Sequence, residues 1–292
     1  MQFKGAFTAL VTPFSGGQID EEAYRKLIEW QLERGINGVV PCGTTGESAT
    51  LSHEEHKRVI SICVDQVKGR VPVLAGAGSN NTAEAVELAR FAKDAGADGA
   101  LLITPYYNKP TQEGLYQHFK RIASEVSMPF ILYNVPGRTS VNLLPATVAR
   151  LYKDIPEVLG IKEATGDLSQ VSQVLEYCGP EVQVLSGDDF TVLPLLSVGG
   201  CGVISVVSNI LPHNMSGLCA AWFKQDLATA QALHFELAAY SRMMFMETNP
   251  IPAKTALSMM GRIKLELRLP LVPMDETNTG KLRQFLQDKG VV

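Results

Sequence analysis

Short apolar runs rich in β-branched residues alternate along the chain with longer segments whose apolar residues recur at helical spacing. The short runs occupy residues 6–11, 38–41, 71–75, 99–103, 129–133, 158–161, 182–185 and 202–207. Runs of this kind are typical of strands buried on both faces. Their starts lie 20 to 33 residues apart, which is about the length of one strand–helix unit. The pattern therefore predicts eight strand–helix repeats.

The segments between the runs carry helix start signals. Asp20 stands immediately before a predicted helix at residues 21–33, and aspartate is a preferred helix-capping residue. Ser52 and Glu55 form an S-x-x-E capping box that opens the next predicted helix. These signals support the alternation of strands with helices.

Eight strands that alternate with eight helices predict an α/β fold of the (β/α)8 barrel type. The alternative is an open, doubly wound parallel sheet. No G-x-G-x-x-G turn occurs in the chain, which favours the barrel. Residues 190–223 lack any Asp, Glu, Lys or Arg, but glycine and proline interrupt them, so they predict a buried helix and a buried strand rather than a membrane span.

The pattern changes beyond residue 224, where no run predicts a strand convincingly. Helices are predicted at residues 227–246, 253–260 and 279–287, with a break at Asn249-Pro250-Ile251-Pro252. We therefore expect a catalytic barrel at residues 1–224 and a small helical appendage at residues 225–292.

Composition narrows the possible classes of protein. The chain has 292 residues, of which 46% are hydrophobic and 19% charged, as expected for a globular protein with a large core. The net charge of −4 and the lack of a Lys/Arg cluster argue against nucleic acid as a partner. The five cysteines are scattered, and residues 1–5 do not resemble a signal peptide, so we expect a cytoplasmic protein with no membrane partner.

Lys162 follows the apolar run at residues 158–161 directly, and turn residues come after it. Lysine is almost never fully buried unless its surroundings hold it there. Burial disfavours the charged form of an amine, and a neutral amine attacks carbonyl carbon to form a Schiff base. The first hypothesis is therefore a carbonyl-attacking lysine. The alternative is a side chain that lies past the strand end and extends to water.

Three further candidates follow predicted strands, at the end of a barrel where active sites form. The turn at residues 43–46 can present backbone N–H groups to an anion, for which a carboxylate is the best candidate. Tyr133 at a strand end can transfer protons, and Arg138 in the next loop can bind a carboxylate through two hydrogen bonds. Taken singly, the segment at 43–46 could be a plain turn, Tyr133 a packed aromatic and Arg138 a solvated cation. Together with Lys162 on one rim, they indicate an active site.

Two other groups of residues have less certain roles. Tyr106 and Tyr107 point in opposite directions if the local chain is extended, so at most one of them faces a given site. His53 and His56 share one helix face, but the H-E-x-x-H pattern and further ligands are missing. We therefore predict no metal site there.

Three motifs resemble the signatures of the pyruvate-dependent class I aldolase family, which belongs to the N-acetylneuraminate lyase superfamily. They are Gly43-Thr44-Thr45-Gly46-Glu47 and the segments at residues 133–139 and 161–167. The resemblance extends over essentially the whole chain and includes residues 249–252. The lysine and tyrosine motifs are shared by the superfamily. The Pro-Gly-Arg-Thr loop and the tyrosine pair are most similar to members that condense pyruvate with L-aspartate 4-semialdehyde in bacterial lysine and diaminopimelate biosynthesis.

The resemblance implies a lyase mechanism without a metal or organic cofactor. Lys162 would form a Schiff base with pyruvate, and the derived enamine would attack the aldehyde to give 4-hydroxy-tetrahydrodipicolinate. Tyr133 would shuttle protons, and Thr44 would link it to Tyr107 of a neighbouring subunit. The family resemblance also suggests a homotetramer built as a dimer of dimers.

The resemblance assigns substrate-binding residues as well. Backbone N–H groups of Thr44 and Thr45 would hold the pyruvate carboxylate, and Arg138 would hold the carboxylate of the semialdehyde. Gly187 and Ile204 correspond to family positions that line the pyruvate pocket.

A feedback site for L-lysine at a dimer interface is a further property of the family. The matching positions here are Ser48, Ala49, Leu51, His53, His56, Asn80, Glu84 and Tyr106. Glu84 could pair with the ammonium group of the ligand, which gives the two histidines a role other than metal binding. We therefore expect inhibition by L-lysine.

Two other functions stay open at this point. One is a sister activity with the same lysine and tyrosine, either N-acetylneuraminate lyase or a 2-keto-3-deoxy sugar acid aldolase. Arg138 and Tyr107 argue against it. The other is a non-catalytic barrel that only binds an amino acid, because a fold alone does not establish an activity.

Overall fold

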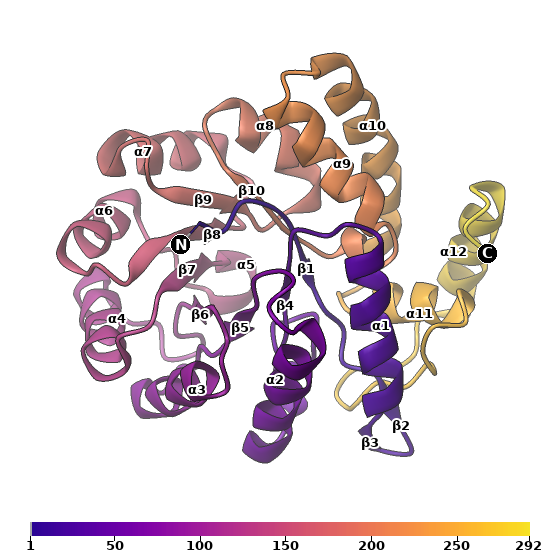
Figure 1. Cartoon of the computed structure of the whole chain (residues 1–292), viewed down its shortest axis with the longest axis horizontal. Helices are drawn as coiled ribbons and strands as arrows, with labels where there is room; N and C mark the ends of the chain where they lie inside the picture. The colour runs from indigo at the N-terminus through magenta and orange to yellow at the C-terminus, as the bar shows by residue number, and fades with distance from the viewer. Residues whose placement is uncertain (1) are drawn as a thin grey trace.

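Eight parallel strands form a barrel at the centre of the computed structural model, which describes residues 2–292 (Figure 1). They are β1 (Gly5–Ala9), β4 (Gly38–Val40), β5 (Leu74–Gly76), β6 (Gly99–Ile103), β7 (Phe130–Asn134), β8 (Val158–Glu163), β9 (Gln183–Ser186) and β10 (Gly202–Ser205). The hydrogen-bonded order is β4-β1-β10-β9-β8-β7-β6-β5. A parallel bridge between Val39 and Val73 joins the two ends of that order. The predicted (β/α)8 barrel is confirmed, and the open doubly wound sheet is excluded.

Helices surround the barrel and follow its strands in chain order (Figure 1). They are α1 (Glu21–Glu33), α2 (His53–Val67), α3 (Thr82–Asp94), α4 (Gln112–Val126), α5 (Pro136–Thr139), α6 (Pro145–Asp154), α7 (Leu168–Cys178), α8 (Val192–Ser197) and α9 (Pro212–Phe223). The predicted caps are present: Asp20 accepts from the N–H of Ala23, and Ser52 and Glu55 form a complete capping box. No helix within residues 2–292 is long and apolar enough to cross a membrane.

Several short elements were not predicted. A small hairpin of β2 (Phe14–Ser15) and β3 (Gln18–Ile19) precedes α1. Three 3-10 turns, η1 (Ser48–Thr50), η2 (Asp189–Thr191) and η3 (Val207–Asn209), follow strands β4, β9 and β10. All of these segments are shorter than the window in which hydrophobic periodicity can be recognised.

Two predicted strand boundaries were wrong for identifiable reasons. The run at residues 202–207 ends as a strand at Ser205, because the Asp189 carboxylate accepts the N–H groups of Val206 (2.9 Å) and Val207 (3.3 Å). The run at residues 71–75 begins as a strand only at Leu74. There the Val73 N–H is bonded to the Asp98 carboxylate at 2.8 Å. In both cases a side-chain carboxylate takes N–H groups that a strand ladder would use.

The strand that carries Lys162 is longer than the apolar run at residues 158–161 suggested. β8 continues through Lys162 to Glu163, and both side chains are buried. Backbone pairing with β7 and β9 continues through both residues. Because this pairing does not depend on apolar side chains, the hydrophobicity pattern ended the strand too early. Lys162 therefore lies within the sheet and not beyond its end.

The chain after α9 continues as α10 (Leu227–Met244), α11 (Ile251–Met259) and α12 (Glu276–Asp288). Figure 1 shows these helices at one side of the barrel. The predicted break at residues 249–252 is too long, because Ile251 and Pro252 already belong to α11. Proline fits the first helical turn, where its missing N–H has no intrahelical partner to lose.

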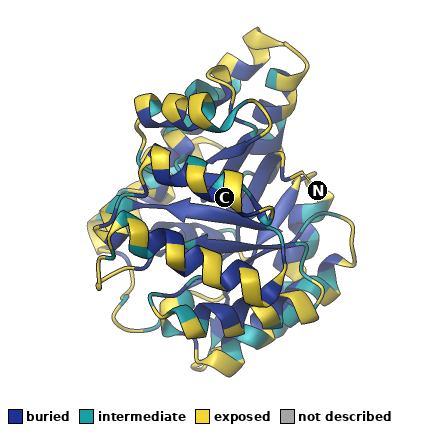
Figure 2. Cartoon of the chain, turned by 90° about the vertical axis from the view of Figure 1, so that its left-hand side faces the viewer, coloured by how far each residue is buried: buried dark blue, intermediate teal, exposed yellow. Residues whose placement is uncertain are grey.

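The buried apolar residues form two clusters. Figure 2 shows the strands coloured almost entirely as buried, whereas the helices alternate between buried and exposed residues. The larger cluster lies between strands and helices, and the smaller one fills the barrel interior. Phe3 and Phe7 pack edge-to-face inside the barrel with ring centroids 6.0 Å apart. Gly38 lies against Phe7, where a Cβ atom would come within 2.1 Å of the ring. Because large apolar side chains fill this interior, polar groups collect at the carboxyl ends of the strands.

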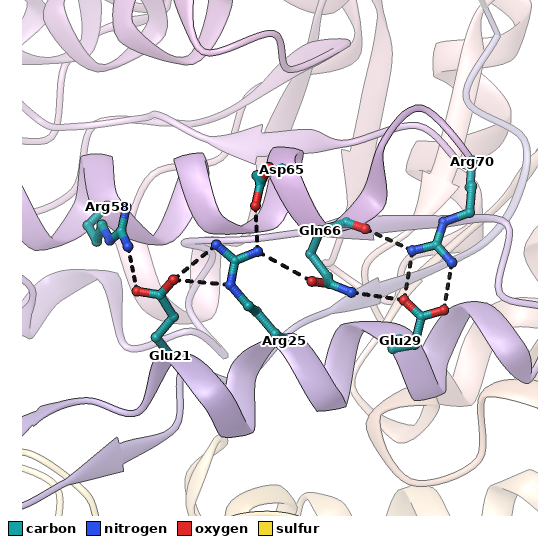
Figure 3. Close-up of polar contacts among 7 residues, drawn as sticks. All are labelled: Glu21, Arg25, Glu29, Arg58, Asp65, Gln66 and Arg70. Carbon is teal, nitrogen blue, oxygen red and sulfur yellow. Dashed lines mark hydrogen bonds and ion pairs between the residues drawn. The ribbon is translucent and has the colours of Figure 1, made fainter.

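A chain of ion pairs joins α1 to α2 on the outside of the barrel (Figure 3). Arg25 bridges Glu21 and Asp65 at 2.9 and 2.6 Å. Arg70 pairs with Glu29 and lowers the pKa of that carboxyl to about 2. Each exposed pair contributes little to stability by itself, but the network fixes α2 next to α1.

Candidate active site

Lys162 and Tyr133 form the centre of the site. They are directly paired across β8 and β7. The Lys162 Nζ lies 4.1 Å from the centre of the Tyr133 ring, and the two residues are 7% exposed. Both line a cavity of about 170 Å³ at the carboxyl ends of the strands. The structure thus brings together a buried amine and a phenol in a space suited to a small molecule.

Gly187 leaves the space that the lysine needs. It follows β9 directly, and its N–H donates to the Glu163 carbonyl at 2.8 Å. A Cβ atom at this position would lie 3.0 Å from the Lys162 Cε and 2.6 Å from the Ala164 Cβ. Gly187 lines the cavity with Lys162, as its predicted position in a substrate pocket requires.

The turn after β4 places Thr44 and Thr45 in the wall of the same cavity. Between residues 2 and 292, no hydrogen bond to the backbone N–H of either threonine is present. The turn itself is closed by the N–H of Gly46, which donates to the Gly43 carbonyl at 3.1 Å. Two adjacent N–H groups beside a buried amine form a suitable site for a carboxylate.

Arg138 lies on α5, directly after the strand that carries Tyr133. Its Nη2 donates to the carbonyl oxygen of Asn249 at 3.2 Å, and the residue is exposed and lines the cavity. Asn249 in turn donates from Nδ2 to the Thr45 hydroxyl at 2.9 Å. Asn249 therefore connects Arg138 to Thr45, two predicted substrate-binding residues. In the sequence it only marked a break between two predicted helices.

Two predicted residues lie outside the cavity. Ile204 is packed in the apolar barrel interior and is 1% exposed. Tyr107 is 91% exposed, and its φ of 72° places it in a turn. The local chain at Tyr107 is therefore not extended, and the two tyrosine side chains do not follow the alternation of a strand.

Three acidic residues that were not predicted as site residues lie near the cavity: Asp189 and Glu163 are buried, and Asp188 is half-buried. Asp188 lines the cavity, and burial raises the pKa of its carboxyl. Burial also raises the pKa of Asp189 to about 6, against the lowering effect of the Ser205 hydroxyl and two N–H groups. Glu163 is held by Asn134, Thr165 and Gln170 at 2.9–3.4 Å. These carboxylates fix the loops after β8 and β9, which adjoin Lys162.

A second cavity, of about 480 Å³, extends from Thr44 and Tyr133 toward α2 and α3. Seven of the eight positions predicted for an effector line it: Ser48, Ala49, Leu51, His53, His56, Glu84 and Tyr106. The eighth, Asn80, donates from Nδ2 to the carbonyl oxygen of Tyr106 at 3.1 Å. The cavity therefore joins the predicted catalytic residues Thr44 and Tyr133 to the predicted effector positions.

The two histidines of this cavity have different surroundings. The His53 Nε2 lies 2.5 Å from the Glu84 carboxylate, at an exposed position. His56 is buried and donates from Nε2 to the Gly76 carbonyl at 2.7 Å. Burial lowers the pKa of His56. The hydrogen bond to the Gly76 carbonyl holds the buried His56 ring between α2 and the end of β5.

These features define a class of protein: a barrel enzyme whose buried lysine can form a Schiff base with a small carbonyl compound beside a carboxylate-binding turn. A family model, the dihydrodipicolinate synthetase family, matches residues 2–289. The chain belongs to that family.

Similar proteins carry consistent descriptions. The 4-hydroxy-tetrahydrodipicolinate synthase of Nitratidesulfovibrio vulgaris is 73% identical over 292 residues, which is 100% of both chains. A chloride-inhibited dihydrodipicolinate synthase from Acinetobacter baumannii complexed with pyruvate is 47% identical, with a TM-score of 0.97 and complete coverage of both chains. The synthase of Cyanidioschyzon merolae with lysine bound is 37% identical, with a TM-score of 0.95 over 99% of each chain.

Proposed function

We propose that this protein is a lyase that condenses pyruvate with L-aspartate 4-semialdehyde to give 4-hydroxy-tetrahydrodipicolinate, in lysine and diaminopimelate biosynthesis. The observation that carries the proposal is the buried Lys162 amine over the Tyr133 ring, in one cavity with Thr44 and Thr45. The high identity to a 4-hydroxy-tetrahydrodipicolinate synthase supports the choice of reaction.

The first half of the reaction builds a nucleophile from pyruvate. The Lys162 amine attacks the keto carbon, water leaves, and the nitrogen becomes part of an iminium ion. Loss of a proton from the methyl group gives an enamine. The N–H groups of Thr44 and Thr45 hold the carboxylate, and Tyr133 moves the protons that the addition and dehydration require.

The second half joins the two substrates. The enamine carbon attacks the aldehyde carbon of L-aspartate 4-semialdehyde, and the aldehyde oxygen takes up a proton. The amino group of the bound semialdehyde then attacks the iminium carbon, which closes the ring and returns Lys162 as a free amine. Arg138 binds the carboxylate of the semialdehyde, since it lines the cavity and is open to solvent.

We assign the proton relay to Tyr133, Thr44 and Tyr107, with Tyr107 supplied by a neighbouring subunit of a homotetramer. The support is that Tyr107 is 91% exposed and lies outside its own chain's cavity. Sedimentation with activity measured across a dilution series tests this point. We expect activity to fall as the assembly dissociates, and a fully active monomer would contradict the assignment.

We also assign the larger cavity to feedback binding of L-lysine. The support is the set of polar groups there, with Glu84 as a carboxylate for the ligand's ammonium group. Adding L-lysine at micromolar to millimolar concentration should lower the rate, and Glu84→Gln should raise the concentration that halves it. An unchanged rate at millimolar L-lysine would contradict the assignment.

We place the enzyme in the cytoplasm, which suits its five free cysteines.

The proposed reaction is tested by incubating the protein with both substrates and following the loss of each by mass spectrometry. We expect equal consumption of pyruvate and semialdehyde. Consumption of pyruvate only with a sugar-type aldehyde, such as N-acetylmannosamine, would favour the sister lyase activity instead.

A further inference from the structure

Glu47 and Lys254 form an ion pair that is fully buried, although no step of the proposed reaction uses either group. The Lys254 Nζ lies 2.5 Å from the Glu47 Oε1, and both side chains are 0% exposed. Glu47 ends the turn that carries Thr44 and Thr45, and Lys254 lies on α11 more than 200 residues later. The pair therefore connects the carboxylate-binding turn to the C-terminal helices.

The contacts of Glu47 leave its carboxylate no freedom to move. Its Oε2 accepts the backbone N–H of Arg268 at 3.1 Å, while Oε1 accepts from Lys254. On its other side, the Lys254 Nζ lies 4.4 Å from the centre of the Phe14 ring. Each of the two carboxylate oxygens and the ammonium group thus has a defined partner.

The backbone of Glu47 is part of the turn itself. Its N–H donates to the Thr44 carbonyl at 3.1 Å, and its carbonyl accepts the N–H of Thr50 at 3.0 Å. Its φ is +53°, in the left-handed region that residues other than glycine seldom adopt. Such a conformation persists where surrounding contacts impose it. A carboxylate held at both oxygens is such a contact.

A second contact from the C-terminal segment reaches the same turn. Asn249 donates to the Thr45 hydroxyl at 2.9 Å and lies five residues before Lys254. Thr45 and Glu47 are therefore both held from outside the barrel, on the two sides of Gly46. The C-terminal segment thus fastens the turn at Thr45 and at Glu47, and these two contacts orient the adjoining N–H groups of Thr44 and Thr45.

Stability alone does not account for such a pair. A buried ion pair is often no more stabilising than apolar groups of the same volume, because both charges lose their hydration. Burial lowers the pKa of Lys254, which reflects this cost, while Glu47 opposes the shift. The pair instead fixes the orientation of the Glu47 side chain, because the carboxylate has one charged partner at one position.

We propose that Glu47 and Lys254 are positioning residues that fix the Thr44–Thr45 turn for binding the pyruvate carboxylate. The inference rests on the proposed function, because it concerns how pyruvate is held before Lys162 attacks. A change confined to carboxylate binding acts equally on the ground state and the transition state. Loss of carboxylate binding raises the KM for pyruvate, and any displacement of Thr44 from the proposed proton relay lowers kcat in addition.

The test uses the full-length chain with Glu47→Gln and Lys254→Met combined. This double variant removes both charges of the pair and nearly keeps both side-chain volumes, so the fold should be retained. Lys162 is trapped with borohydride over a series of pyruvate concentrations, which measures pyruvate binding without the second substrate. We expect the half-saturating pyruvate concentration to rise about tenfold or more, as for a lost charge-assisted contact.

Two further variants separate positioning from general damage. Glu47→Asp keeps the charge but shortens the side chain, and it should raise the half-saturating concentration by a smaller factor. Lys281→Met makes the same lysine substitution at an exposed position on α12 and should match the unsubstituted chain. Denaturant midpoints are measured for all variants.

The outcomes are distinct. A folded double variant with unchanged pyruvate dependence overturns the inference, and so does failure of both the double variant and Glu47→Asp to fold, because the pair would then be a folding element. Trapping of the unsubstituted chain on Lys162 tests the proposed function separately. If that chain forms no adduct, the proposed function fails, whatever the variants do.

Discussion

Lys162 and Tyr133 occupy paired positions on neighbouring strands, with the amine 4.1 Å from the centre of the phenol ring. This pairing follows from the register of β7 and β8. Two rigid strands therefore set the distance between nucleophile and proton carrier, and loops supply the groups that bind substrate.

Tyr133→Phe removes only the phenolic hydroxyl and keeps the ring against Lys162. Because proton transfer by a positioned group contributes roughly 10²- to 10⁴-fold to a rate, we expect kcat to fall by about that factor. Steady-state kinetics and the melting temperature measure the two effects. A folded Tyr133→Phe enzyme with normal kcat would show that another group moves the protons.

Arg138→Ala should impair use of the semialdehyde and leave the pyruvate adduct on Lys162 largely intact. Among residues 2–292, the guanidinium donates a hydrogen bond only to the Asn249 carbonyl, which leaves its other N–H groups to bind a carboxylate bidentately. We expect the KM for the semialdehyde to rise about 10²-fold, with Arg138→Lys intermediate because lysine cannot form the bidentate contact. Equal loss of adduct formation and condensation would contradict this assignment.

Gly187→Ala should hinder the lysine directly. The new methyl group would lie 3.0 Å from the Lys162 Cε and 2.6 Å from the Ala164 Cβ, so one of these groups must shift. Borohydride trapping should show at least about tenfold slower adduct formation, as small displacements of reacting groups cost rate. Gly217→Ala is the matched control, since its Cβ atom meets only Leu233 at 3.5 Å. Equal trapping rates in the two variants would refute the steric argument.

His118 should make the fold sensitive to mild acid. Burial lowers the pKa of His118 to about 4 from 6.5, and the side chain is 6% exposed. The folded state therefore binds fewer protons than the unfolded state between these values. The stability that this histidine contributes is present above pH 6.5 and is lost as pH falls toward 4, on the order of 3 kcal/mol in total.

The measurement for His118 is the free energy of unfolding at several pH values between 4 and 7. His118→Asn keeps an acceptor or donor for the Thr82 hydroxyl, which lies 2.9 Å from the His118 Nδ1. It should show a smaller slope of unfolding free energy against pH than the unsubstituted chain, whatever its absolute stability. Identical slopes would mean that other groups govern the acid response.

The sequence was sufficient to predict the barrel and the central pair of the site. Eight buried strands at regular intervals have few folding solutions, and residues at strand ends necessarily meet at one rim. Lys162 and Tyr133 could therefore be assigned from local pattern, and Arg138 from its place just after a strand. Their positions at or just after strand ends were enough to place these residues on the same rim of the barrel.

Other parts could not be predicted because they depend on contacts between distant segments. Asn249 and Lys254 lie about 200 residues from the turn that they hold, and nothing in their local sequence indicates those partners. The early end of β10 likewise depends on the Asp189 carboxylate, which competes for its N–H groups. Local patterns describe elements and strand ends, whereas tertiary hydrogen bonds decide how loops are held.

The central claim is that Lys162 forms a Schiff base with pyruvate. Incubation with pyruvate and borohydride, followed by intact mass measurement and peptide mapping, tests it most directly. The account predicts one reduced pyruvate unit per chain, on Lys162, and none on a Lys162→Met variant. No adduct, or an adduct at another lysine, would contradict the assignment of Lys162 as the nucleophile and the mechanism built on it.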